Sequence, residues 1–375
     1  MGDLGSVAMN KRIFKEQTSE SGDIPFYKIG TFGATADAFI SRELFETYKK
    51  KYPYPKIGDL LISASGSIGR VVEYKGNDEY FQDSNIVWLK HDDRINNLFL
   101  KQFYSIVKWH GLEGSTIKRL YNKNILETTI HLPVFDEQEK IGTLFKQLDD
   151  IITLHQRKLE QLKELKKAYL QLTFPKKDET VPRVRFADFE DDWQLCKLGD
   201  VVEIFDGTHQ TPRYTDSGVK FVSVENIATL ETKKYITHEA YEKEYSKKRA
   251  KKGDILMTRI GDIGTMKVIE TDEPLAYYVT LALLKAKETN PYFLSFIISS
   301  PEIQRNIWKR TLHIAFPKKI NLGEINQVEM KITIFEEQDK IGDLFTNLDD
   351  AIILNQNKLN QLKSLKKSYL QNMFI

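Results

Sequence analysis

The sequence predicts an α+β protein made of two tandem copies of one globular domain, each followed by a long helix. Residues 134–174 and 334–374 are identical at 26 of 41 positions without a gap, which marks an internal duplication. Short apolar runs separated by Gly, Asn and Asp precede each repeated segment and predict strands of a mainly antiparallel sheet. Inside the repeated segments, apolar residues recur every three or four positions, as in amphipathic helices.

Composition bounds the class of protein. With 375 residues, 41% of them hydrophobic and 29% charged, the chain can hold two domains with full cores. No stretch approaches the roughly 20 apolar residues that span a bilayer, and residues 1–11 do not resemble a secretory signal. The single cysteine, Cys196, excludes an internal disulfide and suits a reducing compartment. We therefore expect a cytoplasmic protein without membrane association. The net charge of +2 argues against a general polyanion binder but does not describe local patches.

The two repeated segments each carry a heptad seam. The seam residues of the first are Ile141, Phe145, Leu148, Ile152, His155, Leu159 and Leu162. Those of the second are Ile341, Phe345, Leu348, Ile352, Asn355, Leu359 and Leu362. A polar residue at a core position commonly fixes register and partner number, so we expect His155 and Asn355 to do so near the helix centres. Each helix is expected to cover about 32 residues, or roughly 48 Å.

Two packing arrangements are open for these helices. They are natural antiparallel partners for each other, because a large domain lies between them in the sequence. The alternative is that each packs against its own domain. When the helices pair with each other, a residual apolar edge could bind another protein; it consists of Leu144, Ile151, Leu154, Leu165 and their counterparts in the second helix.

The globular copies align more loosely, at an offset near 195 residues, so that Gly58–Ser63 falls on Gly253–Thr258. In the first copy we expect strands at Ile24–Ile29, Asp59–Ser63, Arg70–Tyr74 and Asn85–Leu89. In the second we expect them at Lys220–Val224, Asp254–Thr258, Thr265–Ile269 and Thr280–Leu284. Helices are expected at Asn97–Trp109 and Pro291–Arg310. The predicted domains are 1–134, a helix at 135–174, a linker at 175–192, a second domain at 193–334 and a helix at 335–375.

The helices are nearly copied, whereas the globular domains have diverged. Segments that do the same job twice stay alike, and domains that read two different targets need not. Faster drift of surface loops is the alternative explanation.

Polar and basic side chains gather in the predicted loops of both domains. Gln and Arg can read adenine and guanine edges bidentately, and clustered cations suit a nucleic-acid-binding face. The first-domain candidates are Lys11, Arg12, Lys15, Gln17, Ser63, Ser65, Ser67, Arg70, Lys118 and Arg119. The second-domain candidates are Thr208, His209, Gln210, Arg213, Arg259, Asp262, His313, Lys318 and Lys319. For any one of them, ordinary solvated loop charge is the alternative.

No catalytic or metal-binding pattern stands out. The segment Asn290–Phe293 (NPYF) resembles an amino-methyltransferase motif but lacks its second proline, and a helix N-cap followed by Pro explains it. The glycine pairs within Gly66–Gly69 and Gly261–Gly264 lie between predicted strands, which favours tight hairpins over phosphate cradles. The seven His residues are scattered without metal-ligand spacing. We therefore expect a non-catalytic chain that itself binds no metal or cofactor.

Taken together, these features resemble the specificity subunit of type I restriction–modification systems. The landmarks are Arg183–Phe186, Trp193, Lys197–Asp200, Gly207–Pro212, Gly253–Leu256 and Phe335–Gln338. The resemblance covers essentially the whole chain. The first copy departs from the pattern, because it has no lead-in like the one that contains Trp193.

The resemblance implies two target-recognition domains related by pseudo-two-fold symmetry, each reading one half of a bipartite asymmetric DNA site. The two long helices would form an antiparallel coiled coil that sets the distance between the halves. The implied partners are double-stranded DNA, two modification (methyltransferase) subunits and restriction (translocase–nuclease) subunits. S-adenosylmethionine, ATP and Mg would be bound by those partners.

Two rival classes remain. The first is a coiled-coil scaffold with two domains that bind ligands other than DNA. The second is a single-chain enzyme whose motif is not recognised. Salt-dependent duplex binding distinguishes the first rival, and turnover by the isolated chain distinguishes the second.

Overall fold

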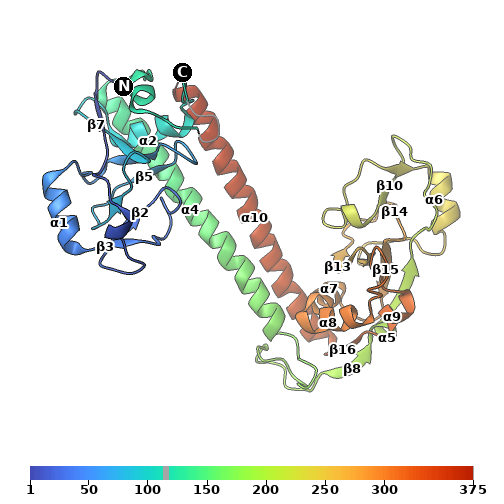
Figure 1. Cartoon of the computed structure of the whole chain (residues 1–375). Coiled ribbons are helices and arrows are strands. Elements are labelled where there is room, and N and C mark those ends of the chain that lie inside the picture. The colour runs from blue at the N-terminus through green and yellow to red at the C-terminus, as the bar shows by residue number, and fades with distance from the viewer. Residues whose placement is uncertain (113–117, 375) are drawn as a thin grey trace. The chain divides into compact units, whose positions relative to one another are not determined.

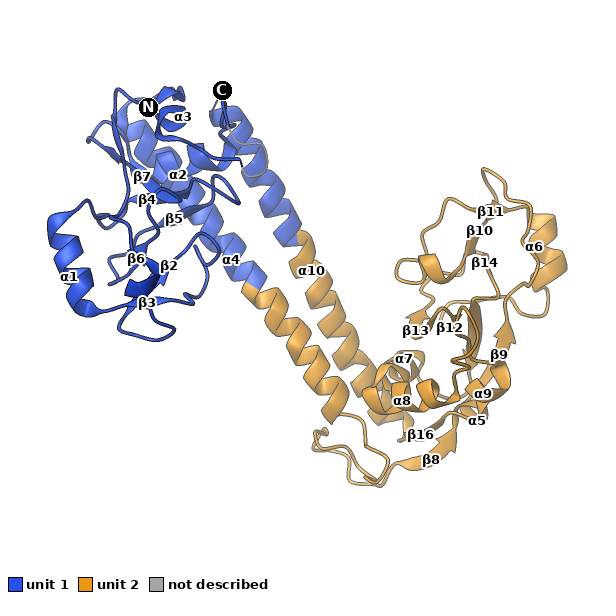
Figure 2. Ribbon diagram, viewed as in Figure 1, with its two compact units in different colours: residues 1–156, 358–375 blue, residues 157–357 orange. Residues whose placement is uncertain are grey.

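The computed structural model describes residues 1–112 and 118–374 (Figure 1). They form two compact units, unit 1 (Met1–Gln156 and Lys358–Ile375) and unit 2 (Arg157–Asn357), which Figure 2 distinguishes by colour. Each unit combines one globular region with the first part of one long helix and the last part of the other. The compact units therefore divide both long helices near their centres.

Unit 1 contains a four-stranded antiparallel sheet and a smaller one. The larger sheet has the order β1 (Gly5–Ala8), β7 (Ile86–His91), β4 (Leu60–Ser63) and β5 (Val71–Glu73). The smaller has the order β3 (Phe39–Ile40), β2 (Ile24–Tyr27) and β6 (Tyr80–Phe81), with β2 and β6 parallel. The helices of the globular part are η1 (Lys15–Gln17), α1 (Arg42–Lys51), α2 (Asn97–Ile106) and α3 (Asn122–Glu127).

Unit 2 repeats this topology. Its larger sheet has the order β9 (Val202–Asp206), β15 (Leu281–Ala286), β12 (Ile255–Ile260) and β13 (Asp262–Val268). Its smaller sheet has the order β11 (Tyr235–Ile236), β10 (Val219–Val222) and β14 (Leu275–Tyr277). The helices are α5 (Leu198–Val201), η2 (Val224–Asn226), α6 (His238–Tyr245), α7 (Pro291–Ser299), α8 (Pro301–Arg310) and α9 (Leu322–Asn326). The α+β class and the tandem repeat are confirmed.

The prediction of one helix over Pro291–Arg310 was wrong. The segment forms α7 and α8, separated by Ser300, whose backbone is extended (φ −65°, ψ 149°). Proline disfavours the helical conformation in the residue before it and has no backbone N–H, so Pro301 starts a new helix at its first position. The expected helix over Asn97–Trp109 also ends earlier, at Ile106.

The long helices are α4 (Phe135–Leu172) and α10 (Phe335–Met373), with 38 and 39 residues. Within unit 1, Lys366 Nζ lies 2.5 Å from Asp149 Oδ1; within unit 2, Lys166 Nζ lies 2.5 Å from Asp349 Oδ1. In each unit the start of one helix therefore lies beside the end of the other, which confirms antiparallel pairing there. All fourteen predicted seam residues are buried or half-buried.

His155 belongs to unit 1 and Asn355 to unit 2, close to the boundary between the units. Asn355 is buried and His155 is half-buried, and both have a polar or electrostatic interaction. The role of this pair in fixing the helix register stays a prediction.

The start of each long helix is also attached to its own globular domain. Gln138 Oε1 accepts the backbone N–H of Asn96 at 2.9 Å, and Gln338 Oε1 accepts that of Asn290 at 3.0 Å. A Cβ atom at Gly142 would lie 2.8 Å from the backbone nitrogen of Phe99, so only glycine permits this approach. The two packing arrangements that the sequence left open therefore occur together.

A lead-in segment, residues 183–197, connects the linker to the second globular domain. Trp193 is buried, with its ring centroid 6.3 Å from that of Phe174 and 5.7 Å from that of Phe293. The strand that follows, β8 (Gln194–Lys197), pairs antiparallel with β16 (Glu329–Ile332). The lead-in thus covers the core where the end of α4 meets the domain.

Candidate nucleic-acid interface

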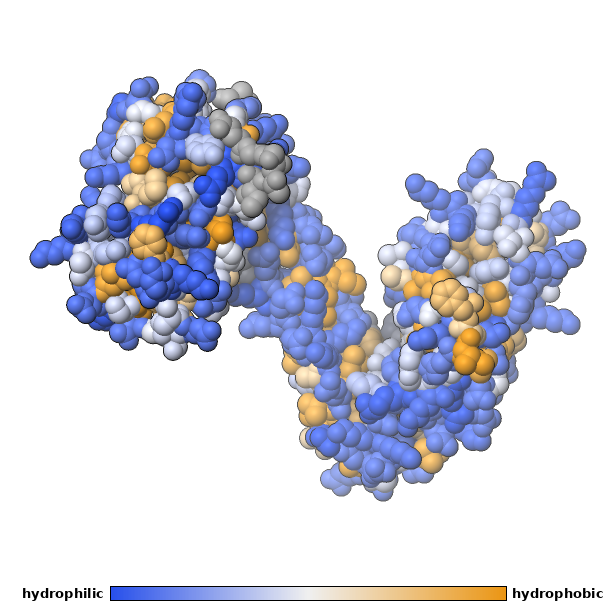
Figure 3. Space-filling view, viewed as in Figure 1, coloured by the Kyte–Doolittle hydropathy of each residue, from blue (hydrophilic) through white to orange (hydrophobic). Residues whose placement is uncertain are grey.

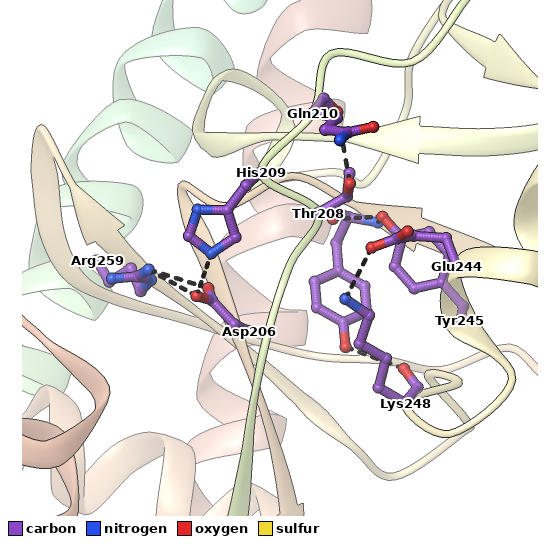
Figure 4. Close-up of polar contacts among 9 residues, drawn as sticks. Asp206, Thr208, His209, Gln210, Glu244, Tyr245, Lys248 and Arg259 are labelled. Atoms are coloured by element: carbon purple, nitrogen blue, oxygen red, sulfur yellow. Dashed lines mark hydrogen bonds and ion pairs between the residues drawn. The ribbon is translucent and has the colours of Figure 1, made fainter.

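In unit 2, a network of charged side chains joins the ends of β9 and β12 (Figure 4). Arg259 Nη2 lies 3.0 Å from both carboxylate oxygens of Asp206, and its Nη1 donates to the carbonyl of Ile320 at 3.2 Å. His209 Nε2 lies 2.7 Å from Asp206 Oδ2. Only 6% of Arg259 is exposed, whereas His209 is exposed. Arg259 therefore braces this strand end, and His209 is presented to solvent.

The loop after β9 is held by its backbone. A Cβ atom at Gly207 would lie 2.3 Å from the carbonyl oxygen of Tyr278, so glycine is required here. The N–H of the buried Thr208 donates to the carbonyl of Tyr277 at 3.1 Å, and its hydroxyl donates to the carbonyl of Gln210 at 3.4 Å. Figure 4 shows His209 directed toward Asp206 and Gln210 beside Thr208 in this loop.

A buried tyrosine, Tyr245, binds the same backbone carbonyl that accepts the N–H of Thr208. The hydroxyl of Tyr245 donates to the carbonyl of Tyr277 at 2.6 Å, and burial raises the pKa of Tyr245 well above its ordinary value. The hydroxyl of Tyr277 in turn donates to the carbonyl of Lys248 at 2.9 Å. Both phenols remain neutral donors at neutral pH and anchor the end of β14, to which the loop is held through the N–H of Thr208.

Each glycine-containing hairpin, one in either unit, has a buried hydroxyl group at the equivalent position, Ser63 in unit 1 and Thr258 in unit 2. Thr258 Oγ1 accepts the backbone N–H of Thr265 at 2.9 Å, and Ser63 Oγ accepts that of Arg70 at 2.8 Å. Both hydroxyl groups are almost completely buried. Ser63 therefore closes the hairpin turn and is not available to a ligand. In the second hairpin Asp262 is exposed and accepts the Thr265 hydroxyl at 2.6 Å.

The segment between α8 and α9 lies beside the second hairpin. The N–H of Gly261 donates to the carbonyl of Lys318 at 2.8 Å, and the N–H of Leu312 donates to that of Lys319 at 2.8 Å. The Trp308 ring lies 4.3 Å from the His313 ring and 4.5 Å from Lys318 Nζ. His313, Lys318 and Lys319 are exposed and are brought to the same strand end as Arg259.

In unit 1, the candidates near the N-terminus follow the end of β1. Arg12 Nε lies 2.8 Å from Asp83 Oδ2, and Lys11 Nζ lies 5.3 Å from the ring centroid of Tyr52. Lys15 is exposed in η1, where Gln17 accepts the N–H of Phe14 at 2.9 Å. The Arg12 guanidinium is exposed and is oriented by a carboxylate, as His209 is in unit 2.

The remaining candidates of unit 1 surround the end of β4. Ser65 is buried, and its hydroxyl donates to Asn85 Oδ1 at 2.6 Å; Arg119 Nη2 lies 3.4 Å from the same oxygen. Arg70 Nη1 donates to the carbonyl of Phe32 at 2.7 Å. Ser67, Arg70, Lys118 and Arg119 are exposed.

Burial separates the predicted residues into two groups. Ser63, Ser65, Thr208 and Arg259 are buried, and we assign them to holding the loops in place, because a buried side chain cannot reach a groove. The half-buried or exposed residues that remain as candidate contacts are Lys11, Arg12, Lys15, Gln17, Ser67, Arg70, Lys118, Arg119, His209, Gln210, Arg213, Asp262, His313, Lys318 and Lys319.

Sequence reasoning missed three residues that organise these sites: Asp206, Asn85 and Trp308. Asp206 directly precedes the Gly207–Pro212 landmark, so an acidic residue beside a polar loop was the available signal. Asn85 and Trp308 gave no such signal, since their partners are 20 or more residues away or belong to a loop of unpredicted shape.

Among residues 1–112 and 118–374, no group of three or more His, Cys, Asp or Glu is arranged to hold a metal ion. Within the same ranges, no helix is both long enough and apolar enough to cross a membrane. Burial raises the pKa of the Cys196 thiol to about 11, so the thiol is protonated at neutral pH.

Comparison with known proteins gives consistent matches. The family model described as the type I restriction modification DNA specificity domain matches residues 1–164 and again residues 190–364. A Haemophilus influenzae chain named as a type I restriction enzyme specificity subunit is 54% identical over 152 residues, which are 40% of each chain. The specificity subunit of a type I restriction enzyme from Methanocaldococcus jannaschii is 23% identical over 310 residues, covering 76% of this chain and 72% of the relative.

The fold is also that of a solved structure. The crystal structure of the S subunit of a type I restriction–modification system from M. genitalium has a TM-score of 0.64 at 15% sequence identity, covering 100% of this chain and 94% of that chain. This likeness concerns the fold alone, whereas the family model matches both globular domains and most of both long helices. The chain belongs to the type I restriction–modification DNA specificity family and carries that family's domain twice.

Proposed function

We propose that this chain is the DNA sequence-recognition subunit of a type I restriction–modification complex, in which each domain reads one half of a bipartite asymmetric site. One observation carries the proposal: at the ends of β4 and β12 the two units have the same backbone hydrogen bonds, but the side chains there differ. Ala64 and Arg259 are equivalent, since each donates its N–H to the loop before β7 or β15. Each also accepts an N–H from the segment that follows α2 or α8, from Leu120 or Ile320. A shared frame with different contents is what two readers of unlike half-sites need.

The exposed residues have the chemistry for this task. Lysine and arginine side chains contact phosphates and set position, whereas Gln, Arg and His groups can read base edges. The scaffold that binds other ligands is not favoured, because the family model that matches both domains describes DNA specificity. We keep the expectation of a prokaryotic cytoplasmic location, since the similar chains come from a bacterium and an archaeon.

We further propose that the long helices set the distance between the half-sites and bind two modification subunits, with restriction subunits joining them. Apolar residues remain exposed on both helices, notably Leu154 in unit 1 and Ile353 and Leu354 in unit 2. Figure 3 shows apolar patches along these helices between hydrophilic residues. S-adenosylmethionine, ATP and Mg belong to the partners in this proposal, and the chain itself is non-catalytic.

The test is to sequence the methylated sites of a host that produces the chain together with its modification subunits. We expect one bipartite motif. Replacing residues 1–134 with those of a relative should change one half of the motif and leave the other intact. A change in both halves, or an intact complex that methylates no motif, would contradict the proposal. Methyl transfer by the highly purified chain alone would contradict the non-catalytic assignment.

The spacing role has its own test. Inserting the same four residues after Arg157 and after Asn357 lengthens both helices by about 6 Å, slightly more than one turn. Both ion pairs between the helices stay within their units, because the insertions fall on the unit boundary in α10 and one residue past it in α4. The gap in the motif should grow by about one or two base pairs of 3.4 Å each, with unchanged half-sites. Methylation at the original gap by an intact complex would show that the helices do not set the spacing.

A further inference from the structure

Two large apolar side chains stand out in the loop between α8 and α9. Ile314 is 98% exposed and Phe316 is completely exposed. Single exposed apolar residues are common and need no explanation. Here two of them, separated by one residue, occupy the tip of one short loop, so burying both against a partner would be favourable.

Backbone pairing with the end of β12 holds both ends of this loop in place, so the tip stays exposed. Leu312 and Lys319 pair with each other, and Lys319 also pairs with Ile260. The N–H of Ile320 donates to the carbonyl of Arg259 at 2.9 Å. The tip is therefore carried by the strand end that also presents His209 and Gln210 through Asp206 and Arg259.

The surroundings of the tip are cationic. The segment Trp308–Ile320 contains Lys309, Arg310, His313, Lys318 and Lys319 and no acidic residue. Within the loop, the His313 ring and Lys318 Nζ both lie against the Trp308 ring at the end of α8. Figure 3 shows apolar side chains on unit 2, near β12 and β13, with hydrophilic surface around them. An apolar tip framed by positive charge matches a polyanion with a stacked apolar interior, which is duplex DNA.

We propose that Ile314 and Phe316 form a wedge that enters the duplex between two base pairs of the half-site read by unit 2, while Lys318 and Lys319 bind the flanking phosphates. Phe and Ile are among the residues that proteins insert between base steps, where they partly unstack and kink the duplex. The wedge favours flexible pyrimidine–purine steps, because these unstack most easily. Unit 2 therefore gains sequence preference at a step that no hydrogen bond reads. This inference rests on the proposed function.

The experiment uses the complex of the full chain with its modification subunits and a duplex that carries the methylated motif. 2-Aminopurine, whose fluorescence rises on unstacking, replaces successive bases of the half-site assigned to unit 2 by domain exchange. We expect a rise at one step. In the double variant Ile314→Ala/Phe316→Ala the rise should disappear, and binding should weaken about tenfold, the scale of one lost stacking contact.

The matched control is Ile57→Ala. Ile57 is 77% exposed and lies in unit 1 just before β4, at the opposite end of that strand from its hairpin. Its removal should change neither the fluorescence nor the affinity. All three side chains are exposed, so the variants should fold like the parent.

The possible outcomes separate the wedge from the proposed function. Specific binding without any fluorescence change, or a double variant that retains the change, overturns the wedge alone. A double variant that fails to assemble with the modification subunits, but binds DNA as before when assembly is forced by excess subunit, shows that the loop contacts protein instead. Absence of sequence-specific binding by the parent complex overturns the proposed function and the wedge together.

Discussion

Glu137 and Glu337 are the same residue of the repeated helix, yet Glu137 is exposed and Glu337 is completely buried. In unit 2, Arg185 of the lead-in donates from Nε and Nη2 to the two carboxylate oxygens of Glu337 at 2.8 Å. Thr333 donates its hydroxyl to the same carboxylate. A copied sequence therefore does not guarantee a copied environment, because segments outside the repeat decide what covers it.

Removing Arg185 should produce the largest difference in stability between the two units. In Arg185→Ala the Glu337 carboxylate stays buried without its cation, which should destabilise unit 2 by about 3 kcal/mol. Hydrogen exchange of the full chain should accelerate around residues 183–197 and 333–345. The control Glu137→Gln, at the exposed counterpart, should stay within about 0.5 kcal/mol of the parent. Equal effects of the two variants would show that the lead-in does not distinguish the units.

The next largest effects should come from the hydroxyl groups that the two hairpins share. Thr258→Ala leaves the partly buried N–H of Thr265 without its acceptor, at a cost of about 1–2 kcal/mol. Ser63→Ala leaves the N–H of Arg70 with only its longer bond to the Ser67 carbonyl, at 3.4 Å, and should cost somewhat less. Exchange of the Thr265 amide in the first variant and of the Arg70 amide in the second should accelerate. Thr258→Ser keeps the acceptor and should behave like the parent. Unchanged amide exchange in both alanine variants would refute the shared turn-closing role.

Smaller, matched effects are expected from the ion pairs between the long helices. Lys166 pairs with Asp349 in unit 2 and Lys366 with Asp149 in unit 1, and all four side chains are partly exposed. Lys166→Ala and Lys366→Ala should each cost at most about 1 kcal/mol and should lose their effect at high salt. The exchanged pair Lys166→Asp/Asp349→Lys should recover part of the loss. A clearly unequal cost of the two alanine variants would show that the pairs are not equivalent.

The smallest effect concerns Cys196 in β8, the strand that the lead-in adds to unit 2. Burial raises the pKa of its thiol from 9.0 to about 11. The folded state thus binds this proton more tightly, so the resulting stability is present below pH 9 and is lost as the pH rises towards 11. Alkylation by iodoacetamide should be slow at pH 8 and should reach its midpoint near pH 11, against about 9 in urea. A midpoint near pH 9 in the native chain would show that the packing of β8 does not bury the thiol.

Much of the fold could be predicted because its signals are local. Repeated apolar spacing marked both long helices, and the apolar runs lie on β4, β7, β12 and β15. The single helix over Pro291–Arg310 is wrong for a local reason as well, since Pro301 interrupts the helical hydrogen bonding at Ser300. The start of α10 at Phe335 likewise agrees with the FEEQ pattern, whose Gln338 accepts the backbone N–H of Asn290, the N-cap residue of α7.

The candidate site was only partly predictable. Composition and loop position identified Arg12, His209, Gln210, Lys318 and Lys319, which are exposed. The same signals also selected Arg259, Ser63 and Ser65, which are buried. Residue type alone does not separate a cation that reaches a ligand from one that braces a strand, because the difference lies in the partner across the sheet.

The sequence by itself determined the duplication, the α+β class, the long helices and the basic character of the loops, because each depends on residue type and spacing along the chain. The tertiary structure decided which copies of a repeated residue are buried and which cations face outward. Asp206 meets Arg259 and Arg185 meets Glu337 across 53 and 152 residues of chain. Such pairs form only when the strands and the lead-in pack together. Tertiary packing, and not residue type, therefore decides whether a charged side chain stabilises the fold or is available for recognition.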